Sequence, residues 1–225
     1  IYDINFQLHR GEVLGFSGLV GSGRTSTAKA IVGAIPKSKG EILIHGKPVK
    51  INNPREAIES GIGYLPEDRK YEGLILTKSV KENITLASLT QKFCNGIVID
   101  HKKEAQVSEE YREKLRIKTP DIQRQVKFLS GGNQQKVVFA KWLCSEVDIY
   151  IFDEPTRGID VGAKSEIYQI INDLVANGAA VIVISSELPE ILGVCDRVLV
   201  MRDGWITADI DRADATQEKI MSYSI

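Results

Sequence analysis

The sequence predicts an α/β fold in which helices cover both faces of a mostly parallel sheet. Short apolar runs alternate along the chain with stretches of helical pattern. The runs lack strict alternation of polar and apolar residues, which is typical of strands buried on both faces. Alternation of strand and helix favours a layered α/β domain. We predict four buried strands, at Val13–Phe16, Ile149–Phe152, Ala180–Ile184 and Val198–Met201.

Helical patterns fill the intervals between these strands. One helix is predicted at Thr25–Val32, directly after the first strand. Another is predicted at Ala163–Asn177, where Gly178 offers a C-terminal cap. The pair Asp203-Gly204 favours a hairpin turn between two late strands. We therefore expect a small antiparallel part beside the parallel sheet.

The stretch from about residue 78 to 146 breaks this rhythm, because its pattern is helical and contains no convincing strand. Val107, Tyr111 and Leu115 recur at i, i+4 and i+8 among charged residues. This spacing predicts a solvated helix with one apolar stripe. We predict a helical lobe inserted between two strands of one domain that spans residues 1–225.

Composition and charge limit the class of protein. Of the 225 residues, 43% are hydrophobic and 26% are charged, which is the balance of a folded globular protein. The 29 Lys and Arg residues oppose 30 Asp and Glu residues, so the net charge is −1. No overall basic field attracts a polyanion, and we expect no nucleic-acid partner. Three cysteines are too few for a disulfide scaffold or a zinc site.

The start of the chain and its apolar runs bear on the cellular setting. The first residue is Ile1, and no signal-peptide pattern precedes the first strand. No apolar run approaches the roughly 18–20 residues of a spanning helix. We therefore expect the chain to be a piece of a longer protein. If it serves a membrane process, we expect it to act from the surface, through a partner.

A glycine-rich sequence follows the first strand and opens the first helix. It matches the phosphate-binding pattern G-x-x-x-x-G-K-[ST] except that Arg24 replaces the lysine. Glycines let successive backbone N–H groups point at a phosphate chain, and the helix N-terminus adds partial positive charge. The Thr25 hydroxyl is a candidate Mg²⁺ ligand. The alternative is a turn that binds nothing. The candidate nucleotide-binding residues are Gly18, Gly21, Ser22, Gly23, Arg24, Thr25 and Ser26.

Two carboxylates follow the strand Ile149–Phe152. Asp153 ends that apolar run, and Glu154 and Pro155 come next. In enzymes with a phosphate loop, an aspartate at the carboxyl end of such a strand holds Mg²⁺. The neighbouring Glu154 is then placed to activate an attacking water. Taken alone, the pair would be an ordinary strand end.

The most specific string is Leu129-Ser130-Gly131-Gly132-Asn133-Gln134-Gln135-Lys136. It resembles the LSGGQ signature of the ATP-binding cassette (ABC) family. Ser130 and the N–H groups of Gly131 and Gly132 would form a second phosphate cradle at a helix start. The resemblance implies that this cradle, with Asn133, acts in trans on the γ-phosphate of an ATP held by another cassette. Alone, the string would be a helix-capping turn.

Further strings narrow the resemblance to one subgroup. Those at Pro66–Lys70, Glu154–Lys164 and Ile184–Leu188 are similar to the C-terminal cassette of tandem ATPases that drive bacterial uptake of simple sugars such as ribose, xylose and galactose. The resemblance implies ATP and Mg²⁺ as cofactors. It also implies three partners: the N-terminal cassette of the same polypeptide or a second copy, a transmembrane permease, and indirectly a periplasmic sugar-binding protein. The implied location is the cytoplasmic face of the bacterial inner membrane.

The resemblance also assigns positions within the site. Asp160 corresponds to a loop that crosses the dimer interface; its alternative role is an acidic residue at a helix start. Glu67 stands where a glutamine usually senses Mg²⁺ and the permease, which makes it a possible Mg²⁺ ligand. Ser186 stands at a switch position where a histidine usually contacts the γ-phosphate. The family's adenine-stacking aromatic residue would precede Ile1.

Three of these positions depart from the usual pattern: Arg24, Glu67 and Ser186. We therefore expect a degenerate ATP site on this chain, with Glu154 retained, and an intact signature lent to a partner. The simpler alternatives are a surface arginine at position 24, a Glu67–Arg69 ion pair and a helix cap at Ser186. If the site does not hydrolyse ATP, the chain would be a regulatory module that binds nucleotide and dimerises.

Overall fold

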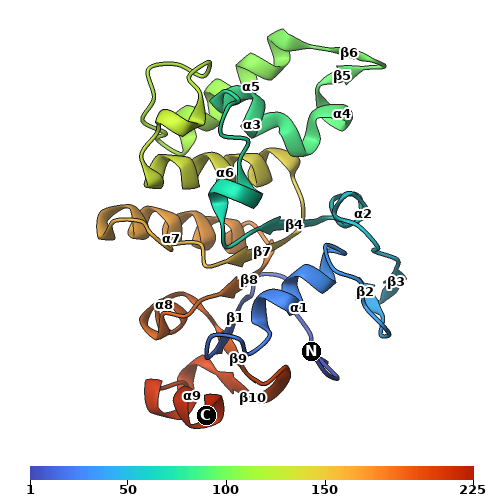
Figure 1. Ribbon diagram of the computed structural model, residues 1–225, viewed down its shortest axis with the longest axis vertical. Coiled ribbons are helices and arrows are strands. Elements are labelled where there is room, and N and C mark those ends of the chain that lie inside the picture. The colour runs from blue at the N-terminus through green and yellow to red at the C-terminus, as the bar shows by residue number, and fades with distance from the viewer.

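The centre of the computed structural model, which describes all 225 residues, is a six-stranded sheet (Figure 1). The strand order is β10-β9-β1-β8-β7-β4, and every neighbouring pair is parallel except β9 and β10. The predicted α/β fold is confirmed. The strands are β1 (Val13–Gly18), β4 (Ile62–Leu65), β7 (Ile149–Asp153), β8 (Ala180–Ile184), β9 (Arg197–Arg202) and β10 (Trp205–Asp211).

Burial on both faces of the sheet explains the continuous apolar runs. Every residue of β8 is buried, and β8 lies between β1 and β7. In register, Leu14 and Ile151 both pair with Ile182. Successive side chains point to opposite faces and enter two separate apolar clusters, of 28 and 12 buried residues. The sheet therefore separates two hydrophobic cores, one on each of its faces.

A helix, a short hairpin and a second helix carry the chain from the phosphate loop to β4 at the edge of the sheet. Helix α1 (Arg24–Ile31) begins one residue earlier than predicted, because Gly23 ends the loop with a left-handed φ of 102°. Further along lie the hairpin β2 (Ile42–Ile44) with β3 (Lys47–Val49), helix α2 (Pro54–Glu59), and the single turn η1 (Arg69–Gly73) after β4.

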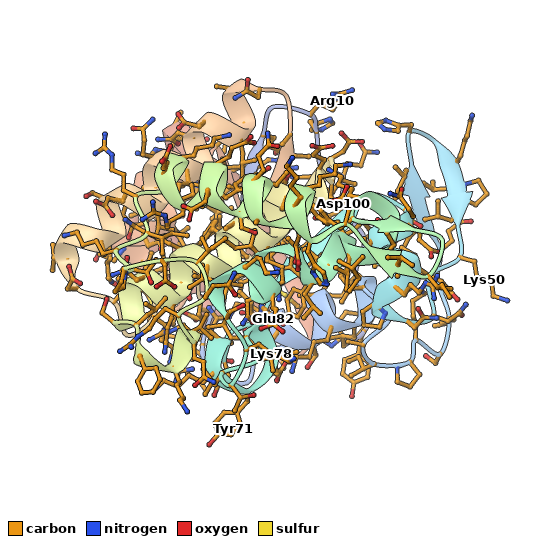
Figure 2. The ribbon with its side chains drawn as sticks, turned by 90° about the horizontal axis from the view of Figure 1, so that it is seen from above. Arg10, Lys50, Tyr71, Lys78, Glu82 and Asp100 are labelled. Atoms are coloured by element: carbon orange, nitrogen blue, oxygen red, sulfur yellow. The ribbon has the colours of Figure 1, made fainter.

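The segment between β4 and β7 is largely helical and stands apart at the top of Figure 1. Ser79 and Glu82 form a capping box at the start of α3, and Asp100 caps α5. Figure 2 shows Glu82 close to Lys78, with which it forms an ion pair of 2.9 Å. The helical elements are α3 (Val80–Thr85), η2 (Leu86–Ser88), α4 (Leu89–Lys92), α5 (His101–Lys114), η3 (Val126–Phe128) and α6 (Gly131–Ser145).

One expectation for this segment is wrong, because it does contain strands. Cys94–Asn95 (β5) and Val98–Ile99 (β6) form a short antiparallel hairpin. Each strand has two residues, which is too short to show a periodic pattern. Gly96, with a φ of 65°, lies in the turn.

Helix α6 returns the chain from this segment to the sheet. Near its end, Trp142 lies against Gly63 of β4: a Cβ built on Gly63 would lie 2.9 Å from Trp142 Cε3. A side chain at position 63 would therefore force the helix away from the strand. Trp142 packs in the core, because only 9% of its surface is exposed.

Lys141, the residue before Trp142, is a buried cation without a carboxylate partner. Its Nζ donates to the Gly73 carbonyl at 2.7 Å, and burial lowers its pKa to about 8. The folded state therefore binds this proton less tightly than the unfolded chain does. The resulting penalty is complete below pH 8 and shrinks as the pH rises toward the unfolded pKa of 10.5.

Lys141→Met should therefore stabilise the fold at pH 6.5 by about 1–2 kcal/mol, after the loss of the bond to Gly73 is subtracted. The gain should be smaller at pH 10. Urea unfolding of both proteins at the two pH values measures it, with the exposed Lys102→Met as control. A gain independent of pH would contradict the stated cause.

The remaining helices follow β7 to the end of the chain. Helix α7 (Val161–Ala176) starts two residues before its predicted start and ends with Asn177 as its cap and Gly178 at a φ of 85°. The Asp203-Gly204 turn joins β9 to β10, as predicted. The other helices are α8 (Leu188–Val194), η4 (Arg212–Asp214) and α9 (Gln217–Ser224). None of the helices is both long enough and apolar enough to cross a membrane.

Candidate functional site

The loop between β1 and α1 offers a row of free hydrogen-bond donors. Gly21 and Gly23 have φ values of 87° and 102°, in the left-handed region that favours glycine. The backbone N–H groups of Gly23, Arg24, Thr25 and Ser26 donate to no backbone acceptor. Free N–H groups at a helix start attract anions, and phosphate above all. A row of free donors of this kind can bind the oxygens of a phosphate chain.

A pocket of about 340 Å³ opens over this loop. It brings the loop together with predicted residues far along the chain, and only one of its lining residues is hydrophobic. Gly18, the last residue of β1, and Asp153, the last residue of β7, do not line it. The lining residues are Val20, Gly21, Ser22, Gly23, Arg24, Thr25, Ser26, Glu67, Glu154, Arg157 and Ser186.

Asp153, the last residue of β7, is fully buried with one unpaired oxygen. Tyr64 donates to Oδ2 at 3.1 Å, whereas Oδ1 has no hydrogen-bond partner. Burial raises the pKa of Asp153, and the neighbouring hydroxyls of Thr25 and Tyr64 oppose that rise. An unpaired carboxylate oxygen beside a threonine hydroxyl is the type of ligand that Mg²⁺ prefers. These residues fit the ion, although nowhere do three His, Cys, Asp or Glu side chains form a metal-binding group by themselves.

Glu154 is held in a strained and nearly buried position at the pocket wall. Its φ is 49°, and 11% of its side chain is exposed. Ser186 Oγ donates to Oε2 at 3.1 Å, and Arg24 Nη1 lies 3.9 Å from Oε1. Burial raises the pKa of Glu154, while Ser186 and the charge of Arg24 lower it. The carboxylate thus faces the pocket between a hydroxyl and a cation.

Arg24 is not the surface arginine of the simpler alternative, because only 8% of it is exposed. Its Nη1 donates to the Ser185 carbonyl at 2.6 Å. Burial lowers the pKa of Arg24, and the charges of Glu154 and Asp153 raise it. A guanidinium keeps its charge in proteins. A fixed cation therefore stands between the phosphate loop and Glu154.

Glu67 pairs with Arg157 and not with Arg69, so the simpler alternative for Glu67 named the wrong partner. Both members of the pair line the pocket. Arg157 is a site residue for which the sequence provided no role, although it lies only three positions after Glu154.

Ser186 does not cap a helix. The N-cap of α8 is Glu187, whose N–H donates to Ser185 Oγ at 3.0 Å. Ser186 instead points its hydroxyl at Glu154. Ser185 therefore bonds to the start of α8, whereas Ser186 bonds to Glu154 in the pocket.

The signature residues and Asp160 lie outside this pocket. Ser130 is the N-cap of α6, and Asn133 Nδ2 donates to its Oγ at 2.9 Å. None of Ser130, Gly131, Gly132 and Asn133 lines the pocket. Asp160 caps α7, with Oδ1 accepting from the Ala163 N–H at 3.0 Å, which confirms the role at a helix start. Its interface role stays a prediction.

Sequence relatives match this chain over its whole length. A putative ribose/galactose/methyl galactoside import ATP-binding protein of Burkholderia lata is 51% identical over 224 residues, which cover 100% of this chain and 44% of that protein. A ribose import ATP-binding protein of Clostridium tetani is 51% identical over 226 residues, covering 100% and 45%. The chain thus spans less than half the length of these relatives.

Solved structures show the same fold. An ATP-binding cassette of an ABC transporter superposes with a TM-score of 0.83 at 20% identity, over 99% of this chain and 91% of that chain. A dimeric cassette in a post-hydrolysis state bound to ADP and Pi gives a TM-score of 0.79 at 20% identity, over 93% and 89%.

The family model described as ABC transporter matches residues 1–157, which include the phosphate loop, the signature string and both carboxylates. The chain belongs to the ABC transporter family.

Proposed function

We propose that the chain is a single ATP-binding cassette, with the lobe at about residues 78–146 inside it, that powers uptake of a simple sugar. The free N–H groups at Gly23–Ser26, beside the unpaired oxygen of Asp153, are the observation that carries the proposal. The names of the relatives support a sugar of the ribose or galactose type. The proposed partners are another cassette, a permease at the cytoplasmic face of the inner membrane and, through the permease, a periplasmic sugar-binding protein.

Each part of the pocket has a role in this proposal. The loop N–H groups bind the phosphate chain, and Thr25 and Asp153 hold Mg²⁺, with Glu67 as a possible third ligand. The ion neutralises phosphate charge when bound. Glu154 accepts the proton of the attacking water, and Ser186 orients Glu154 through the bond at 3.1 Å.

Arg24 supports the proposal that this site is degenerate. Its guanidinium is anchored on Ser185 and lies 3.9 Å from Glu154. A nearby cation lowers the basicity of a carboxylate and weakens it as a proton acceptor. We expect slow hydrolysis here, while Ser130–Asn133 complete a more active site on the partner cassette.

The Arg24–Glu154 contact also favours a second candidate function. If the cation suppresses the base entirely, the chain would bind nucleotide and dimerise without hydrolysing ATP. It would then regulate the partner through Ser130–Gly132. The two candidates share the binding site and differ only in turnover.

Calorimetry with ATP, in Mg²⁺ and in EDTA, tests the proposal on this chain, and phosphate release measures turnover. The affinity for ATP should be higher in Mg²⁺ than in EDTA. Asp153→Asn removes a metal ligand, so it should reduce this difference in affinity at least about tenfold. The exposed Asp173→Asn is the control. Absence of ATP binding under both conditions would sink the proposal.

A further inference from the structure

Arg69 makes contacts that the proposed roles do not use. It is the first residue of the turn η1, directly after the loop that carries Glu67. Its Nη1 donates to the Arg157 carbonyl at 2.8 Å, and its Nη2 donates to the Gly158 carbonyl at 3.4 Å. Burial lowers the pKa of Arg69, and the charge of Asp68 opposes that change. One guanidinium thus holds two successive carbonyls of the loop that follows Glu154.

Glu67 holds the same loop from the other side. It forms an ion pair with the side chain of Arg157, whereas Arg69 binds the backbone of Arg157. Two residues of one loop therefore fix both the side chain and the carbonyl of Arg157. Among these, Glu67 and Arg157 line the pocket and Arg69 does not.

The Nη2 atom of Arg69, which donates to the Gly158 carbonyl, also faces the signature. A Cβ built on Gly131 would lie 2.8 Å from Arg69 Nη2 and 3.3 Å from the Gly158 carbonyl oxygen. A Cβ on Gly132 would lie 3.2 Å from Ala163 Cβ. The signature glycines are therefore packed against Arg69, the Gly158 carbonyl and the start of α7, and a side chain at either position would require these neighbours to shift.

We propose that Arg69 is a positioning residue that holds the Arg157–Gly158 turn against the start of α6, and so fixes Ser130–Gly132 for binding a phosphate on the partner cassette. The inference rests on the proposed lending of the signature. An arginine suits the task because its planar fork donates to two carbonyls at once. A lysine can point only a compact ammonium at them.

The test uses ATP turnover by the full-length polypeptide that contains this chain, in a Glu154→Gln background. The remaining turnover then comes from the site that Ser130–Gly132 complete. Arg69→Met should lower kcat about tenfold and change the KM for ATP less than about threefold, because the pocket that binds that ATP is untouched. Arg69→Lys should restore part of kcat.

Two controls complete the design. Arg55→Met removes an exposed arginine whose ion pair with Glu59 is on the surface, and it should leave kcat unchanged. Gly131→Ala should lower kcat as Arg69→Met does, since it displaces the same guanidinium. If Arg69→Met fails to fold, shown by thermal unfolding, the Arg69→Lys variant decides the question.

The outcomes separate the two proposals. Loss of kcat in Gly131→Ala with none in Arg69→Met or Arg69→Lys would overturn the role of Arg69 and leave the lent signature standing. Unchanged kcat in Gly131→Ala and in both Arg69 variants would overturn the lending of the signature, and the role of Arg69 with it. A rise in KM without loss of kcat would also overturn the positioning role.

Discussion

Glu154→Gln should lower ATP turnover at this site at least about 100-fold, because glutamine cannot accept the proton of the attacking water. Binding of Mg·ATP should stay within about threefold, since glutamine can still accept the Ser186 hydrogen bond. The removed charge lies 3.9 Å from Arg24, whose guanidinium stays anchored on the Ser185 carbonyl. Calorimetry for binding and phosphate release for turnover separate the two effects.

The same variant decides between the two candidate functions. If the wild-type chain binds ATP, turns it over, and loses that turnover in Glu154→Gln, the site is catalytic despite Arg24 and Ser186. If wild type and variant release phosphate at the same rate, the turnover does not depend on Glu154 and the regulatory function is favoured. The exposed Glu218→Gln is a matched control for the change of one charge.

Gly18→Ala should destabilise the protein by at least about 3 kcal/mol, which is a large share of the roughly 5–15 kcal/mol by which ordinary proteins are stable. Gly18 has a φ of 148°, which side chains rarely adopt. A Cβ built there would lie 2.2 Å from the carbonyl oxygen of Met201 on the neighbouring strand β9. Because the obstacle is backbone within the sheet, no side-chain rotation relieves the clash.

Gly21→Ala provides the matched comparison within the same loop. Its φ of 87° is also strained for alanine, but nothing lies within 4 Å of the added Cβ. Only the backbone strain remains, and it costs about 1–2 kcal/mol. Urea unfolding should give Gly18→Ala a much lower free energy of unfolding than Gly21→Ala. Equal losses would mean that the contact with β9 is not the cause.

The strands that the sequence predicted are runs of four or five mostly apolar residues. Every residue of β8 is buried, so its whole sequence carries the signal. Strand β4 escaped prediction because it has only four residues, of which Gly63 makes room for Trp142 and Tyr64 carries a polar hydroxyl, so its apolar signal is weak. The strands β2, β3, β5 and β6 have two or three residues each, which is too few for a period to appear.

Some parts of the site are contiguous in the sequence, whereas others join residues that are far apart in it. The phosphate loop and the Asp153-Glu154 pair are contiguous strings, so the sequence alone could predict them. The bond from Tyr64 to Asp153 joins residues 89 positions apart, and the Glu67–Arg157 pair spans 90. The anchoring of Arg24 on Ser185 spans 161. Such pairings depend on the packing of the sheet, which no local pattern encodes.

The contact of Trp142 with Gly63 gives α6 the properties of a lever. The contact lies near the end of the helix, about 16 Å from Gly131 at its start, at 1.5 Å per residue. With this contact as the pivot, a rotation of about 10° would carry the signature about 3 Å while moving the strand end of the helix very little. The long arm therefore amplifies a small tilt, and Arg69 lies where the motion is largest.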